Sequence, residues 1–233
     1  MLAATLRTHS FVQPTAAFLQ GRAAAGLPPL GLMNSPLLFP ASATASRCWW
    51  CGVDPQYVEY HDTEWGVPSH DNRYLFEKIV LEGFQAGLSW LTILRKRQRF
   101  REVFANFEVD RLAKFGPREV ERLVLDAGIV RHRGKIESAI NNAKRCRELV
   151  AERGSLEAFL WSFAPAEPPP LIRSQAEIRP ESPESKALSK ELRRRGWSFV
   201  GPTTMYAMMQ AVGIVNDHVE GCAWRARAGT RRR

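Results

Sequence analysis

Two clusters of cysteine and histidine lie far apart in this chain of 233 residues. Cys48 and Cys51 flank two tryptophans, and His61 follows them. Near the other end, His218 precedes Cys222 by four residues, which would place both on one face of a helix. Thiolate and imidazole are preferred zinc ligands, and four protein ligands leave no open position for catalysis. The spacing therefore indicates a structural zinc site with five candidate ligands.

The Cys48-x-x-Cys51 spacing alone leaves other interpretations open. The same spacing occurs in zinc knuckles, redox dithiols and disulfides, and buried cysteines beside unconnected histidines would look identical. More than 150 residues separate the two clusters, which argues against a local zinc finger. Four cysteines are too few for a disulfide scaffold at this length, so we favour metal ligation in a reducing compartment.

Aromatic residues are dense in the stretch after Cys48. They usually build a core, but flat rings beside polar groups can also stack on a nucleobase that has left the double helix. The residues concerned are Trp49, Trp50, Tyr57, Tyr60 and Trp65, with Trp90 further along.

A single carboxylate interrupts an apolar helical pattern. Leu75, Ile79, Glu82, Ala86 and Trp90 follow steps of three and four, so on a continuous helix they share one face. Burying a charge without a partner is unfavourable. Glu82 is therefore a candidate for binding a cationic or hydrogen-bonding ligand, and on that hypothesis its replacement by glutamine should not destabilise the fold.

The remaining pattern predicts an all-α architecture. From Asn72 onward, helical periodicity alternates with glycine and proline. We expect further helices over 117–127, 135–152 and 156–163, and a surface loop over 165–183.

A helix, a glycine-bounded turn and a second helix are predicted after that loop. Ser182 and Pro183 are typical of a helix start, Gly196 ends the helix near Arg195, and Gly201-Pro202 begins the next. Such a hairpin can bind a DNA phosphate through free backbone N–H groups, although an ordinary helix pair has the same pattern. The basic runs Arg131–Lys135 and Lys190–Arg195 favour a phosphate-binding surface.

The net charge of +9 comes mainly from the two ends of the chain, since all acidic residues lie between Asp54 and Glu220. We predict a disordered N-terminal extension over 1–46, a folded domain over 47–224 and a basic disordered tail over 225–233. No apolar run suits a membrane span, and we expect a cytoplasmic monomer. An organelle-targeting role for 1–46 is a less favoured alternative.

Four long motifs make the chain resemble the DNA-3-methyladenine glycosylase I family, a zinc-containing branch of the helix-hairpin-helix glycosylases. They run in collinear order over most of the chain: CWWCGVDPQYVEYHDTEWG at 48–66, LEGFQAGLSW at 81–90, DAGIVRHRGKI at 126–136 and NDHVEGC at 216–222.

The resemblance implies one structural Zn²⁺ per chain, tying the two ends of the domain together. The ligands it implies are Cys48, His61, His218 and Cys222, with Cys51 outside the set. It also implies a pocket in which Glu82, the catalytic candidate, accepts hydrogen bonds from the amino edge of the base. Trp50 and Trp90 would stack on that base, while Tyr57 and Tyr60 would shape the pocket.

The implied reaction is hydrolysis of the N-glycosidic bond of a 3-methyladenine flipped out of alkylated double-stranded DNA. The second hairpin helix has no lysine between Thr203 and Val215, where related bifunctional enzymes carry a Schiff-base nucleophile, so a monofunctional enzyme is expected. Asp217 precedes a zinc ligand and is assigned no catalytic role.

Two alternatives remain open at this point. A DNA-damage binding protein of the same fold would bind alkylated DNA without excising the base. A zinc-stabilised helical interaction module would not distinguish alkylated from normal DNA.

Overall fold

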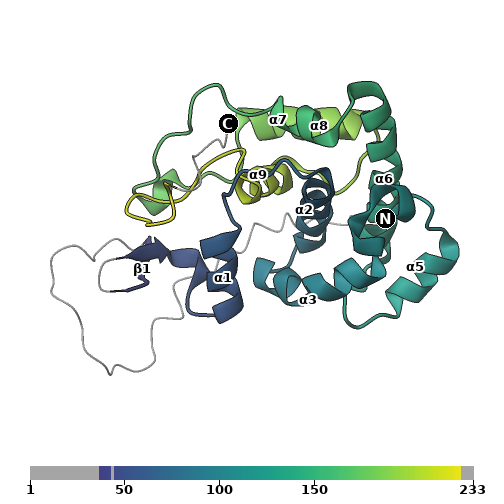
Figure 1. Ribbon diagram of the computed structural model, residues 1–233, viewed down its shortest axis with the longest axis horizontal. Helices are drawn as coiled ribbons and strands as arrows, with labels where there is room; N and C mark the ends of the chain where they lie inside the picture. The colour runs from purple at the N-terminus through teal and green to yellow at the C-terminus, as the bar shows by residue number, and fades with distance from the viewer. Residues whose placement is uncertain (1–36, 43–44, 227–233) are drawn as a thin grey trace, which may run out of the picture.

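The computed structural model describes residues 37–42 and 45–226, and these form a mostly helical fold (Figure 1). The α-helices are α1 (Pro55–Thr63), α2 (Asn72–Gln85), α3 (Trp90–Val103), α4 (Val109–Leu112), α5 (Pro117–Val124), α6 (Arg133–Arg153), α7 (Leu156–Trp161), α8 (Pro183–Arg194) and α9 (Pro202–Ala211). Short 3-10 turns occur at η2 (Trp49–Cys51), η3 (Ala105–Phe107) and η4 (Gln175–Glu177). The all-α prediction is confirmed. None of the described helices has the length and apolar character needed to span a bilayer.

Helix α2 is the central element of the core. Every residue from Leu75 to Phe84 is buried, because α3, α6, α7 and α9 pack around this helix. A polar side chain in this stretch of α2 is therefore enclosed by protein, whichever way it points. Glu77, Lys78 and Glu82 are all buried in this way.

Short polar side chains begin most of the longer helices. At each start, the side chain accepts a hydrogen bond from a backbone N–H group of the first turn, which the helix itself leaves unpaired. The capping residues are Asp54 for α1, Asp71 for α2, Ser89 for α3, Ser155 for α7 and Ser182 for α8.

The prediction of one continuous helix from Leu75 to Trp90 is wrong, because α2 ends at Gln85. Gly87 has a positive φ of 81°, and Ser89 caps a new helix that begins at Trp90. Lys135 reaches from α6 and donates to the carbonyl oxygen atoms of Phe84 and Ala86, the latter at 2.5 Å. Lys135 thus stabilises the end of α2, and its buried ammonium group does not belong to an exposed basic run as the sequence suggested.

The predicted pair of helices joined by a glycine-bounded turn is confirmed. Helices α8 and α9 pack against each other, and Gly196 has a φ of 80° at the turn. Asn142 of α6 holds the turn by accepting a hydrogen bond from the backbone of Ser198. At Gly83 of α2, an added side chain would come within 3.2 Å of Phe199, so glycine lets the turn lie close to α2.

The predicted N-terminal extension, residues 1–46, includes residues that belong to the folded domain. Strands β1 (Leu38–Pro40) and β2 (Ser46–Cys48) form an antiparallel pair, and Leu37 is buried beside them. This difference arises because a three-residue strand gives no sustained periodicity in the sequence. Residues 1–36 lie outside the described part of the chain.

The two ends of the domain lie side by side. Ser46 pairs with Cys222, and the backbone N–H of Ala223 donates to the carbonyl oxygen of Ser46. Figure 1 shows the yellow C-terminal loop at the same end of the molecule as β1 and α1.

Candidate functional site

Cys48, His61, His218 and Cys222 converge in one buried cluster. The Nδ1 atom of His218 lies 3.3 Å from the Cys222 sulfur and 3.6 Å from the Cys48 sulfur, and the Nε2 atom of His61 lies 3.6 Å from the Cys222 sulfur. All four ligand atoms lie within 4.8 Å of one another. This group can hold a metal ion.

The distances in this cluster fit a tetrahedral ion. Zinc bonds of about 2.3 Å to sulfur and about 2.1 Å to nitrogen place the two atoms roughly 3.6 Å apart. Burial raises the pKa of the Cys48 thiol, whereas its hydrogen bond to Cys222 lowers the pKa of Cys222. A divalent cation bound here would stabilise the thiolate form of both cysteines.

Neighbouring groups orient the ligands. Asp62 lies 2.8 Å from the Nδ1 atom of His61, which directs Nε2 toward the cluster, and Arg47 forms a bidentate pair with Asp62. The Cys51 thiol donates to the carbonyl oxygen of Cys48 at 3.1 Å, and Cys51 is absent from the cluster of ligand atoms. This position agrees with the prediction that Cys51 lies outside the ligand set.

Arg225 belongs to this end of the domain and not to a disordered tail. Its guanidinium donates to the carbonyl oxygen of His218, and its backbone N–H donates to the carbonyl oxygen of Cys222. The predicted tail boundary at residue 225 therefore differs from the structure, and residues 227–233 lie outside the described part.

The aromatic residues form a connected wall beside the cluster. The ring of Trp50 lies 5.2 Å from that of His61, 5.1 Å from Tyr57 and 6.5 Å from Tyr60, and Tyr60 lies 5.4 Å from Trp90. Trp50 and Tyr57 are half-buried, whereas Tyr60 and Trp90 are buried. The structure thus brings together the four aromatic residues predicted to bind a base. Trp50, at one end of this wall, contacts His61 of the metal cluster.

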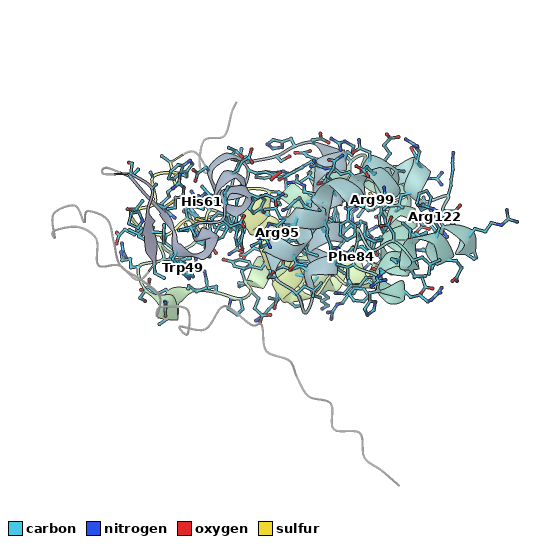
Figure 2. All side chains as sticks on the ribbon, turned by 90° about the horizontal axis from the view of Figure 1, so that it is seen from below. Trp49, His61, Phe84, Arg95, Arg99 and Arg122 are labelled. Carbon is cyan, nitrogen blue, oxygen red and sulfur yellow. The ribbon has the colours of Figure 1, made fainter. Side chains whose placement is uncertain are left out.

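Figure 2 shows His61 and Trp49 at one end of the molecule, with Arg99 and Arg122 toward the other and Phe84 between them. The Cys/His cluster therefore lies at one end of the domain, and the aromatic wall extends from it toward α2 and α3.

Glu82 is buried beside this wall, because the Lys78 ammonium contacts both Glu82 and Trp90. Glu82 and Trp90 do not share one helix as predicted, since Trp90 belongs to α3. Burial raises the pKa of its carboxyl group to about 7, and the nearby Lys78 ammonium opposes that shift. The Nε1 atom of Trp90 is also buried, and within residues 37–42 and 45–226 it has no hydrogen-bond partner. The site thus offers a carboxylate acceptor and an indole donor among aromatic faces.

Lys78 is the principal residue that the sequence analysis missed. Its ammonium lies 3.6 Å from the Glu82 carboxylate and 3.9 Å from the centre of the Trp90 ring, and it donates to the Tyr60 hydroxyl at 2.8 Å. The sequence did contain a signal for Lys78: it lies four residues before Glu82, a spacing that puts both side chains on one face of α2.

A second ionic network fixes α1 and α2 against α3. Arg97 donates to Glu64 and to the buried Glu77, and Arg101 donates to Glu77 as well. These two carboxylates are therefore paired with arginines, whereas Glu82 is paired with Lys78.

Asp217 takes part in a structural network. Its carboxylate accepts hydrogen bonds from Tyr206 at 2.6 Å, Gln210 at 2.8 Å and Arg179 at 2.9 Å. Asp217 therefore joins α9 to the loop before α8, and its lack of a catalytic role stays a prediction.

Several arginines of the predicted basic runs are paired with acids. Arg133 pairs with Glu121, while Arg194 and Arg195 both pair with Glu191. The positive charge available near the hairpin is thus smaller than the sequence suggested.

A hollow of about 610 Å³ lies away from Glu82. It is lined by the start of α2, by α4 and by α6, with Val109 and Val150 among its apolar residues.

A family model described as methyladenine glycosylase matches residues 50–226. DNA-3-methyladenine glycosylase 1 of Escherichia coli (strain K12) is 48% identical over 177 residues, which cover 76% of this chain and 95% of that protein. A crystal structure of 3-methyladenine DNA glycosylase I is similar with a TM-score of 0.73 and 47% identity, covering 76% of this chain and 98% of the other. A variant of 3-methyladenine DNA glycosylase I crystallised in complex with 3-methyladenine is similar with a TM-score of 0.71 and 33% identity, covering 74% and 94%.

Proposed function

This chain belongs to the methyladenine glycosylase family, and on that premise we propose that it hydrolyses the N-glycosidic bond of 3-methyladenine in alkylated DNA. The substrate is double-stranded DNA in which the damaged nucleotide has been flipped out, and a monomer is sufficient for the reaction.

The observation that carries this proposal is the buried Glu82 carboxylate at the aromatic wall. A base methylated at N3 and still attached to deoxyribose carries a positive charge, which normal adenine lacks. A carboxylate and aromatic faces both attract such a cation. Glu82 accepts a hydrogen bond from the amino edge of the base, and the free indole N–H of Trp90 adds a donor.

The four aromatic residues have two different roles in recognising the base. Trp50 and Trp90 stack on the flipped base, while Tyr57 and Tyr60 define the width of the pocket. Because Trp50 contacts His61, the position of one stacking ring depends on the metal cluster.

The chemistry requires little beyond this binding. N3-methylation makes adenine a good leaving group, so holding the flipped nucleotide near the transition-state geometry lets water displace the base. Helix α9 carries no lysine, so no Schiff-base nucleophile is available there and the DNA strand stays intact.

The α8–α9 hairpin binds the DNA backbone in this proposal. The N-terminus of α9 begins at Gly201-Pro202 and directs backbone N–H groups and the positive end of the helix dipole outward. The turn also lies against Gly83, next to Glu82, so a phosphate bound there is close to the base pocket.

One zinc ion held by Cys48, His61, His218 and Cys222 stabilises the fold. With four protein ligands it supplies structure and no reactive water. A reducing compartment such as the bacterial cytoplasm would keep the two thiols available for it.

Base release from methylated DNA tests the function. The purified chain should release free 3-methyladenine from methylated duplex DNA, separated by chromatography, and the strand should break only after alkali treatment. Tight binding to methylated DNA without base release would favour a damage-binding protein. Equal binding to methylated and unmethylated DNA without release would favour an interaction module.

A further inference from the structure

Three polar side chains form a stripe on the buried face of α6. Lys135, Ser138 and Asn142 follow one another at steps of three and four residues, so they share one face of the helix. All three are buried. Burying polar groups is unfavourable unless each has a hydrogen-bond partner, so the partners of this α6 stripe indicate its role.

One end of the α6 stripe holds the segment that leads into the base pocket. Lys135 donates to the carbonyl oxygen of Phe84 at 2.9 Å and to that of Ala86. These carbonyl groups lie where α2 ends and the loop to Trp90 begins. Lys135 therefore fixes the backbone between Glu82 and Trp90, the acceptor and one of the stacking rings proposed for the base.

The other end of the α6 stripe holds the turn of the α8–α9 hairpin at Ser198. The Asn142 side chain accepts a hydrogen bond from the backbone N–H of Ser198 at 3.0 Å and donates to its carbonyl oxygen at 2.9 Å. The Ser138 hydroxyl donates to the same carbonyl oxygen at 3.1 Å, and the Ser198 hydroxyl donates to Ser138 at 2.7 Å. Both backbone groups of Ser198 are thus paired with α6.

The conformation of the turn depends on these hydrogen bonds. Phe199, which follows Ser198, has a positive φ of 54°, a conformation that residues other than glycine rarely adopt. The turn also lies close to α2, since an added Cβ at Gly83 would be 3.2 Å from that of Phe199. Apolar side chains would fill the space of the α6 stripe, but they would leave Ser198 without its partners. The α6 stripe therefore determines where the turn lies relative to the base pocket.

We propose that Ser138 and Asn142 are positioning residues for the reaction, because together with Lys135 they keep the DNA-binding turn and the base pocket in a fixed relative position. This inference rests on the proposed function. A duplex bound at the hairpin places its flipped nucleotide in the pocket only if the distance between the two sites matches the DNA backbone. A displacement of about 1 Å between a bound substrate and the groups that act on it can slow a reaction about a hundredfold. Binding at either site alone is insensitive to such a displacement.

Asn142→Leu tests this inference, because leucine has a similar volume and cannot pair with Ser198. Single-turnover release of 3-methyladenine from methylated duplex DNA, measured at saturating protein, should be at least about tenfold slower than in the parent. The dissociation constants for free 3-methyladenine and for undamaged duplex should stay within about threefold of the parental values, since each reports one site by itself. Ser138→Ala, which removes fewer of the bonds to Ser198, should slow release by a smaller factor.

Cys146→Ser is the matched control for stability. Cys146 is buried on α6 four residues after Asn142, and it lines the hollow between α4 and α6. Placing a hydroxyl group there should lower the melting temperature without slowing base release. All rates are compared at a temperature at which every variant is folded, as shown by circular dichroism.

A parental single-turnover rate in folded Asn142→Leu would overturn the inference and leave the proposed function intact. If Asn142→Leu did not fold, a parental rate in Ser138→Ala would be the contradicting result. Slower release with an equal loss of affinity for free 3-methyladenine would also overturn it, because the fault would then lie in the pocket.

Two further results would contradict a positioning role. Release slowed as much in Cys146→Ser as in Asn142→Leu would show that the rate follows stability. Weaker binding to undamaged duplex with a parental rate at saturation would show that α6 acts on the hairpin alone. If the parent released no base, the proposed function would fail, and this inference with it.

Discussion

Glu82→Gln is expected to slow the release of 3-methyladenine by about a hundredfold, because a hydrogen bond to a charged group contributes about 1.5–3 kcal/mol. Glutamine keeps the size of the side chain and an acceptor oxygen, but it loses the charge that attracts a cationic base. Binding to undamaged DNA should be unchanged, since phosphate contacts come from the α8–α9 hairpin in our proposal. Single-turnover release and duplex binding, measured on the same preparation, check both expectations.

The sequence alone predicted that this variant would be as stable as the parent, and Lys78 reverses that expectation. Removing Glu82 leaves the Lys78 ammonium buried without its counter-ion, and breaking one side of a buried pair is destabilising. Glu82→Gln should therefore melt a few degrees below the parent. The double variant Lys78→Met/Glu82→Gln removes both charges and should recover the melting temperature while remaining slow.

These variants separate the chemistry of Glu82 from its effect on stability. If the folded Glu82→Gln protein released the base at the parental rate, Glu82 would play no part in the mechanism, and recognition would rest on the aromatic residues. A double variant as active as the parent would lead to the same conclusion.

Loss of the metal should produce the largest change in stability. The cluster closes a loop of 170 residues between Cys48 and His218 and joins β2 to the C-terminal segment. We expect one equivalent of zinc in the purified protein, and Cys222→Ser should lose that zinc and lower the melting temperature on the order of 10 °C. Metal analysis and thermal melts, with and without a chelator, measure both effects.

Cys51→Ser is the matched control for this experiment. The Cys51 thiol donates to the carbonyl oxygen of Cys48, and a serine hydroxyl can make the same bond. Cys51→Ser should therefore retain its zinc and most of its stability. Zinc loss in Cys51→Ser together with full zinc in Cys222→Ser would show that the ligand set is wrong.

Local signals in the sequence were sufficient to predict most of the helical framework. Ser182 with Pro183 predicted the start of α8, and Gly196 its end, because capping and positive φ depend on a few adjacent residues. Glu82 was found because one carboxylate on an apolar helical face departs from a regular pattern. The four metal ligands came from the family resemblance, and the structure confirms that they meet.

Features that depend on distant parts of the chain could not be predicted in this way. The turn after Gln85 is held by Lys135 from α6, 49 residues after Ala86 in sequence, and nothing near Ala86 indicates that contact. Lys135 looked like part of a basic run because sequence does not reveal burial. The β1–β2 pair was missed because three-residue strands have too little periodicity to detect.

The position of bound 3-methyladenine tests the central claim most directly. In the complex of the parent protein with free 3-methyladenine, nuclear Overhauser contacts should join the methyl and ring protons of the base to the ring protons of Trp50, Tyr57 and Trp90. Contacts instead to Val109 and Val150, in the hollow between α4 and α6, would contradict the assignment of the base pocket to Glu82 and its aromatic wall.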